Sequence, residues 1–131
     1  MKINVPIKVN ITNKDIYYIL ASAIEGGINY WCDKYKGEPI YRYNVKTVEC
    51  SWEWLIYGGS LTFFADDEKH TLTRDLFEKG FQMWIDRHGK DRERLVHYDS
   101  KTNRFKFIGD LDAGDADSII QYGVFGKIVY G

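Results

Sequence analysis

The chain has 131 residues, of which 18 are basic and 19 are acidic, so its formal net charge is -1. A near-neutral chain creates no long-range field that would attract duplex nucleic acid or an anionic membrane, and we expect neither as a partner. No apolar run reaches the roughly 18 to 20 residues of a membrane-spanning helix, and the N-terminus has no apolar signal core. A chain of this length is about one domain, which we expect over 1–131. Cys32 and Cys50 fit two reduced thiols, so we expect the protein in the cytoplasm.

The N-terminal quarter predicts a strand followed by a helix. Apolar residues occupy every second position of 3–9, which is typical of a half-buried strand, and Pro6 favours a sheet edge because it lacks an amide donor. Thr12 and Asp15 have the spacing of a capping box at a helix start. The apolar stripe that follows is helical, and we expect it to continue through two glycines to Trp31.

The next part of the chain predicts strands. Aromatic and aliphatic residues alternate with polar ones between about 41 and 65, and two glycines interrupt the pattern. We therefore expect 50–57 and 61–65 to pair as a hairpin across the turn at 57–60. The charged residues at 66–69 are expected to form a solvated loop.

A second helix is expected to begin near Thr73 and to end at Gly89. Its apolar face combines Phe77, Phe81, Trp84 and Ile85. The charged stretch 90–103 follows, with short strands possible at 95–98 and 104–108.

A final helix is expected to start at Asp112 or Asp115, because acids at a helix start suit the helix dipole, and to run to about Tyr130. Together the elements predict an α+β fold in which an antiparallel sheet packs against N-terminal, middle and C-terminal helices.

Two segments, 23–32 and 117–126, have a similar composition, in which glycines and aromatics surround a strongly polar residue. A buried polar side chain needs a specific partner, which is either part of the fold or a ligand. In the first segment Glu25 and Asn29 share a helical face beside Trp31. Such groups can bond the edge of a nucleobase while the ring stacks on it. The alternative is that Glu25 pairs locally and the aromatics are core.

In the second segment Gln121 lies one helical turn beyond Asp117, so their side chains can meet, and Tyr122 adds a ring. We expect Gln121 to serve a ligand, so that replacing it with Ala costs little stability. The alternative is close packing of glycine-bearing helices, with Gly123 against the glycines of the first segment or against a second copy. Such a surface makes a homodimer the expected oligomer.

A local excess of arginine and lysine lies between 87 and 106. Arg92 and Arg94 alternate with acids and would share one face of an extended segment, so they are the first choices for contact with phosphate. The alternative is an ordinary solvated surface.

Signals for metals and catalysis are weak. The acidic run that begins at Asp110 has Gln121 where a calcium loop requires Glu, and no pair of cysteines or histidines has zinc-site spacing. Pairing of Cys32 with a distant histidine as a nucleophile remains open. We therefore expect no metal, no cofactor and no enzymatic activity.

The segments 25–32 (EGGINYWC) and 116–131 (ADSIIQYGVFGKIVYG) resemble the two end signatures of a family of small phage- and prophage-encoded proteins of Gram-positive bacteria. The family brings no established catalytic residues. The resemblance implies the cytoplasm of a bacterial host and a role against host defence. Some phage proteins of this kind capture the nucleotide second messengers of systems such as Thoeris and CBASS. Others block a defence protein directly, as anti-CRISPRs do.

Residues and resemblance together predict an anti-defence protein that sequesters a small nucleotide-like immune signal, of the cyclic nucleotide or cyclic ADP-ribose class, without catalysis. One alternative is a protein–protein inhibitor of a host defence effector, and a second is a small hydrolase. The expected ligand-binding residues are Glu25, Asn29, Trp31, Arg92, Arg94, Gln121 and Tyr122.

Overall fold

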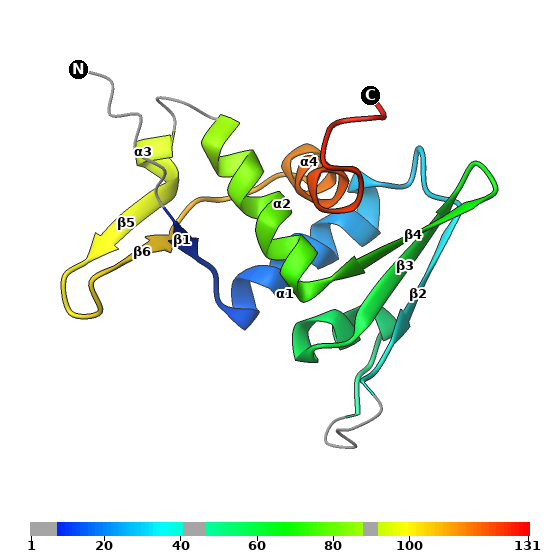
Figure 1. The fold of residues 1–131 in the computed structure, drawn as a ribbon, viewed down its shortest axis with the longest axis horizontal. Helices are drawn as coiled ribbons and strands as arrows, with labels where there is room; N and C mark the ends of the chain where they lie inside the picture. The colour runs from blue at the N-terminus through cyan, green and yellow to red at the C-terminus, as the bar shows by residue number, and fades with distance from the viewer. Residues whose placement is uncertain (1–7, 41–46, 88–91) are drawn as a thin grey trace.

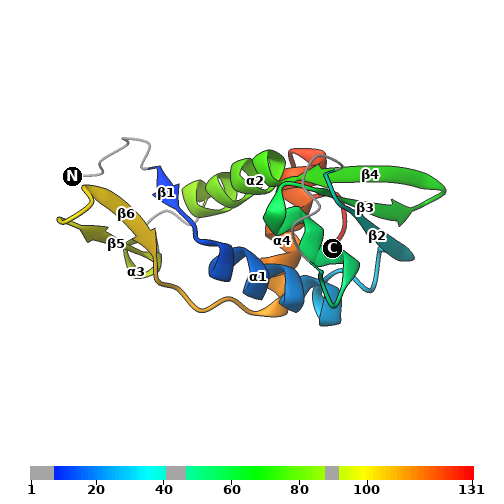
Figure 2. The same ribbon diagram turned by 90° about the horizontal axis from the view of Figure 1, so that it is seen from below.

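The computed structural model describes residues 8–40, 47–87 and 92–131. It has two three-stranded sheets at opposite ends of the molecule, with the helices α1, α2 and α4 between them (Figure 1). Figure 2 shows the same arrangement from below. The α+β class expected from the sequence is confirmed. Within the described residues, no helix is long and apolar enough to cross a membrane.

The smaller sheet has the order β1-β6-β5. Its strands β5 and β6 are antiparallel, whereas β1 pairs in parallel with β6 and lies at the edge, as the sequence predicts for the first strand. The rest of the strand expected at 3–9 lies outside the described residues. The two short strands expected after residue 95 are confirmed to within a residue. The bounds are β1 Val9–Asn10, β5 Val96–Asp99 and β6 Arg104–Phe107.

The larger sheet is antiparallel and has the order β2-β3-β4. Its strands are β2 (Lys34–Glu38), β3 (Ser60–Ala65) and β4 (Glu68–Thr73). The central strand β3 alternates between buried and half-buried residues, so one face of the sheet packs on the core. Only 66–67 form the turn before β4, which makes the solvated loop shorter than expected.

The hairpin expected between 50–57 and 61–65 is wrong. Residues Ser51–Tyr57 form the 3-10 helix η2 instead, and β3 pairs with β2 and β4. The buried side chains of η2 are Trp52, Leu55 and Ile56, which have helical spacing. The strand pattern expected at 41–45 lies outside the described residues.

Helix α1 (Asn13–Ser22) begins with the predicted capping box. The Asp15 amide donates to Thr12 Oγ1 at 3.1 Å, and the Thr12 amide donates to Asp15 Oδ2 at 2.8 Å. The helix continues as the π-helix η1 (Ala23–Gly27) and ends there. The expected continuation is therefore correct as far as Gly27 and wrong for the residues up to Trp31, which form a turn.

Helices α2 (Arg74–Arg87) and α4 (Ala113–Phe125) pack against each other in the core, and the short α3 (Arg92–Leu95) precedes β5. All four residues of the apolar face predicted for α2 are buried, while its expected stop at Gly89 lies outside the described residues. Asp112 caps α4, as one of the two predicted alternatives. The helix ends where Gly126 adopts a positive φ of 72°, short of Tyr130.

Candidate functional site

The two glycine–aromatic segments meet in space. A Cβ atom on Gly27 would overlap the backbone carbonyl of Ala113 and lie 3.5 Å from the Cβ of Asp117. This close approach brings the turn after η1 against the first turns of α4. Gly123 of α4 has a different neighbour, because a Cβ atom on Gly80 would lie 2.5 Å from the amide nitrogen of Gly123. The expected contact between the two glycine pairs is therefore replaced by one between α2 and α4.

Asp117 is the centre of a buried polar network. Tyr30 Oη donates to its Oδ2 at 2.6 Å, and Trp31 Nε1 and Gln121 Nε2 donate to its Oδ1 at 2.7 Å and 2.9 Å. The predicted meeting of Asp117 and Gln121 is confirmed. Burial, followed by the hydrogen bond to Asp117, raises the pKa of Tyr30. Three donors satisfy a carboxylate that is only 7% exposed.

Gln121 also holds the C-terminal residues in place. Its Oε1 accepts the backbone amides of Val129 and Tyr130 at 2.8 Å and 2.9 Å, and its Nε2 reaches the Tyr130 carbonyl at 3.2 Å. The Tyr130 ring stacks on Trp31 with a centroid distance of 5.1 Å. Tyr130 Oη donates to Asp66 Oδ2 at 2.6 Å, which raises the pKa of Tyr130 to about 12.

These contacts favour the structural interpretation of Gln121 and Trp31 over the ligand-binding one. Gln121 is 1% exposed, and both its donor and its acceptor atoms bond within the fold. The indole of Trp31 is buried between Tyr130 and core aromatics, and its one donor bonds Asp117. A base would find neither a free hydrogen-bonding edge nor a free ring face here.

The remaining predicted site residues do not gather in one place. Glu25 and Asn29 are exposed, and the Asn29 side chain donates to the backbone carbonyl of Glu25 at 3.4 Å. Tyr122 is half-buried, with the Arg87 guanidinium carbon 5.2 Å from its ring centroid. The Tyr122 ring, which the sequence suggested for a ligand, therefore has a cation–π contact with Arg87 in the fold.

Arg92 and Arg94 lie in α3, which precedes β5 at the end of the molecule that carries the smaller sheet (Figure 1). The extended segment on which both were expected to share one face is wrong, because the structure places them in a helix.

The described residues give little support for a catalytic or metal-binding site. Among the described residues, no three histidine, cysteine or acidic side chains are placed to hold a metal ion. Cys32 is half-buried and donates to the Lys34 carbonyl, and burial raises the pKa of its thiol, which opposes formation of the reactive thiolate.

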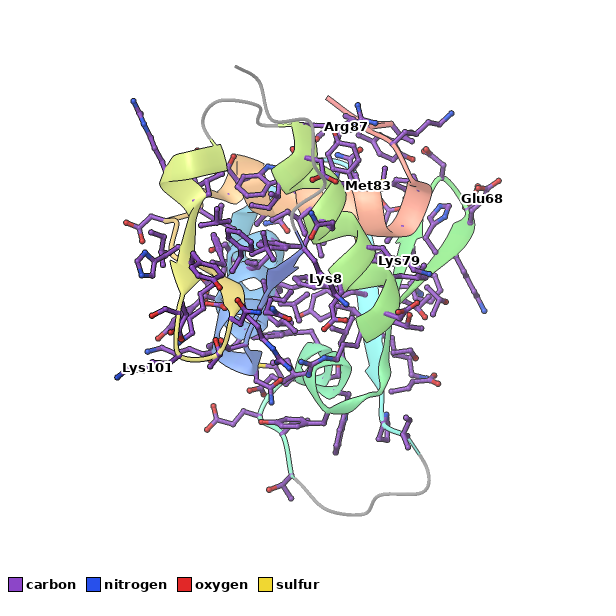
Figure 3. The ribbon with its side chains drawn as sticks, turned by 60° about the vertical axis from the view of Figure 1, so that its left-hand side comes forward. Lys8, Glu68, Lys79, Met83, Arg87 and Lys101 are labelled. Atoms are coloured by element: carbon purple, nitrogen blue, oxygen red, sulfur yellow. The ribbon has the colours of Figure 1, made fainter. Side chains whose placement is uncertain are left out.

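A groove of about 500 Å³ lies between β1 and α2. Figure 3 shows Lys79, Met83 and Arg87 following one another along α2, with Lys8 beside the helix. Much of the polar lining is paired within the protein: Gln82 accepts the Val9 amide and donates to Asp86, and Lys79 pairs with Asp75. The lining residues are Lys8, Val9, Asn10, Ile11, Asp75, Glu78, Lys79, Gln82 and Asp86.

The side of the larger sheet that faces away from the core, here called the outer sheet face, carries a different set of groups. Leu61, Phe63 and Ala65 of β3 are buried in the core, so the alternate residues of all three strands form the outer sheet face. The strand register arranges them in three rows. These rows are Lys34–Phe64–Lys69, Lys36–Thr62–Thr71 and Glu38–Ser60–Thr73.

Phe64 is half-buried at the middle of the first row. The Lys34 and Lys69 ammonium nitrogens lie 4.8 Å and 5.7 Å from its ring centroid. In the next row the hydroxyls of Thr62 and Thr71 are 3.1 Å apart. The three rows therefore contain three lysines and one acidic residue. This residue, Glu38, pairs with Lys36 at 3.6 Å.

Comparisons of the chain with protein-family models, curated proteins and solved structures find no match. A function must therefore be inferred from the geometry of the molecule itself. The outer sheet face combines an aromatic ring, ammonium groups and hydroxyls on one open surface, and these groups can stack on a base, pair with phosphate and bond sugar or base edges.

Sequence reasoning missed this surface for a specific reason. The alternation at 61–65 was visible, but the β2 segment Lys34–Glu38 is mostly polar and contains a glycine, so no strand was expected there. Without β2 and the correct partner of β3, the lysines could not be placed beside Phe64. The available signals were Lys34 and Lys36 at alternating positions, and Lys69 shortly after the aromatic segment 61–65.

Proposed function

We propose that the protein is a non-catalytic binder of nucleotide-type ligands and that the outer sheet face is its binding surface. The observation that carries the proposal is the position of Phe64 between two lysine ammonium groups on an open sheet. An aromatic ring flanked by cations suits a ligand that has both a flat ring and a phosphate.

The lysines can exchange their contact with the Phe64 ring for a contact with phosphate. In the free protein, Lys34 and Lys69 lie over the Phe64 ring, where the ring face attracts their charge. A stacked base would take their place over the ring, and the flexible side chains would turn their ammonium groups toward its phosphate. Binding then needs movement of side chains only.

This proposal keeps the ligand class expected from the sequence and changes the site. Gln121 and Trp31 belong to the Asp117 network, so the polar and stacking groups come from β2, β3 and β4 instead. A protein that binds a nucleotide and leaves it intact would serve the sequestering role that the resemblance to phage proteins implies.

A thermal-shift series with adenine nucleotides, cyclic dinucleotides and ADP-ribose isomers tests the proposal. Ligand at about 100 times its dissociation constant should stabilise the protein by about 2.7 kcal/mol. Chromatography of the heat-treated supernatant should return the ligand unchanged. The shift should vanish in Phe64→Val and persist in Phe64→Tyr, which keeps a ring.

The matched control is Tyr18→Val on α1. Tyr18 is exposed and has the Lys14 ammonium 5.9 Å from its ring centroid, so it offers the same type of contact on another surface. Tyr18→Val should bind like the parent. Equal losses in both variants, or no stabilisation by any nucleotide, would contradict the proposal, and a chemically altered ligand would indicate an enzyme.

A further inference from the structure

We infer that the ligand of the outer sheet face is a single strand of nucleic acid rather than a free mononucleotide. The inference rests on the proposed function and names its ligand more closely. The openness of the surface, the spacing of its lysines and the size of its local charge support it.

The surface is too open to bind a small ligand tightly. Pockets for small molecules are concave and bury most of the ligand surface. On the outer sheet face, Lys34, Lys36, Lys69 and Thr71 are all exposed, so a base stacked on Phe64 keeps its other face in solvent. A single contact of this kind gives weak binding, and strong binding needs several contacts along an extended ligand.

The lysines of β2 form a track along the edge of the sheet. Lys34 and Lys36 project from the same face two residues apart, which in a strand is about 6.6 to 6.8 Å. Successive phosphates of an extended single strand are separated by a similar distance, so two neighbouring phosphates can each meet one lysine. β2 is an edge strand of the sheet, so the ligand backbone can follow it in solvent.

The bases would then turn inward across the sheet. From the β2 edge, the first row places Phe64 about 4.8 Å further in, and the second row places Thr62 at the corresponding position. One base would stack on Phe64, and the next would meet the paired hydroxyls of Thr62 and Thr71. Lys69 lies beyond the ring and can reach a phosphate or a base carbonyl.

The charge favours a single strand over a duplex. The whole chain has a net charge of -1, so only local groups attract the ligand. Three lysines provide too small a footprint for strong duplex binding, which draws on many phosphate contacts. Stacking on Phe64 needs an unpaired base, which a single strand offers and a duplex does not.

Fluorescence anisotropy with a short labelled oligothymidylate, the matching oligouridylate, a hairpin duplex and thymidine monophosphate tests the inference. The single strands should bind clearly more tightly than the mononucleotide and the duplex. The two single strands differ in the 2′-hydroxyl and in the thymine methyl group, so their comparison shows whether these groups together affect binding. If three lysines each neutralise a phosphate, affinity should fall about 20-fold between about 50 and 200 mM salt.

Variants locate the contact. Phe64→Val should weaken oligothymidylate binding by about 5- to 150-fold, and Phe64→Tyr should restore it. The double variant Lys34→Ala/Lys36→Ala should reduce the slope of log affinity against log salt by about 1.4. The control Lys14→Ala/Tyr18→Val, which removes the exposed cation–π pair of α1, should leave binding unchanged.

The outcomes separate this inference from the proposed function. Equal, Phe64-dependent binding of the mononucleotide and the single strands would overturn the inference and leave the proposed function standing. Binding of neither, or binding unaffected by Phe64→Val, would overturn both. Preference for the hairpin duplex would also overturn the inference, since it would indicate contact through the phosphate backbone alone.

Discussion

Replacement of Gln121 by Ala tests whether the Asp117 network serves the fold. The Gln121 side chain is almost fully buried and bonds Asp117, two backbone amides and one carbonyl of the C-terminal residues. From the sequence alone we expect this variant to fold almost normally. The structure leads to the opposite expectation, because removal of the side-chain amide leaves the backbone amides of Val129 and Tyr130 without their partner.

The size of the effect follows from those partners. Val129 is 48% exposed, so its amide can bond water, whereas Tyr130 is half-buried against Trp31. A buried group left without its partner costs about 1–3 kcal/mol, and the removed side chain also leaves a cavity, so a total of about 3 kcal/mol is expected. For a chain of this length, that corresponds to a fall of about 10 °C in melting temperature.

Thermal and urea unfolding, followed by tryptophan fluorescence, measure the effect. The matched control is Ser118→Ala on the same helix, since Ser118 is half-buried and bonds only the Gly114 carbonyl one turn before it. Ser118→Ala should melt close to the parent. If Gln121→Ala melts like Ser118→Ala, the network does not stabilise the fold, and the ligand-binding interpretation of Gln121 returns.

Two further predictions concern the packing and the ionisation of the same region. Gly27→Ala should lower the free energy of unfolding by about 1–3 kcal/mol, because its Cβ overlaps the Ala113 carbonyl, whereas Gly26→Ala, with no neighbour within 4 Å, should not; equal melting temperatures would contradict the close packing. The folded-state pKa of Tyr130 is raised from 10.0 to about 12, chiefly by Asp66, so its stabilisation is complete below pH 10 and is lost as pH rises toward 12. Melting temperatures across that range should therefore fall more steeply in the parent than in Tyr130→Phe, and parallel curves would refute the role of the Asp66 contact.

Local chemistry made the helix starts predictable. The capping boxes at Thr12 and Asp112 depend on side chains three residues apart, so the sequence contains the whole signal. The apolar spacing of α2 is similarly complete within one helix. The helix around 51–57 was missed because Trp52 and Ile56 also fit a strand alternation, and only burial shows that Leu55 belongs with them.

Contacts between residues far apart in the chain could not be predicted from the sequence. Asp117 and Gln121 are one turn apart, so their contact was predictable, but Trp31 and Tyr30 reach the same carboxylate from 86 and 87 residues away. The π-helix that ends at Gly27 and the turn after it bring Tyr30 and Trp31 to Asp117. Arg92 and Arg94 were expected to share one face of an extended segment, whereas α3 is helical.

The most direct test of the central claim is a map of backbone amide chemical shifts during titration with the short oligothymidylate. The account predicts that the largest changes lie on the outer sheet face, around Lys34, Lys36, Thr62, Phe64 and Lys69, with the Asp117 network unchanged. Changes confined to α3 and β5 or to the groove beside α2, or a spectrum unaffected at saturating oligonucleotide, would contradict it.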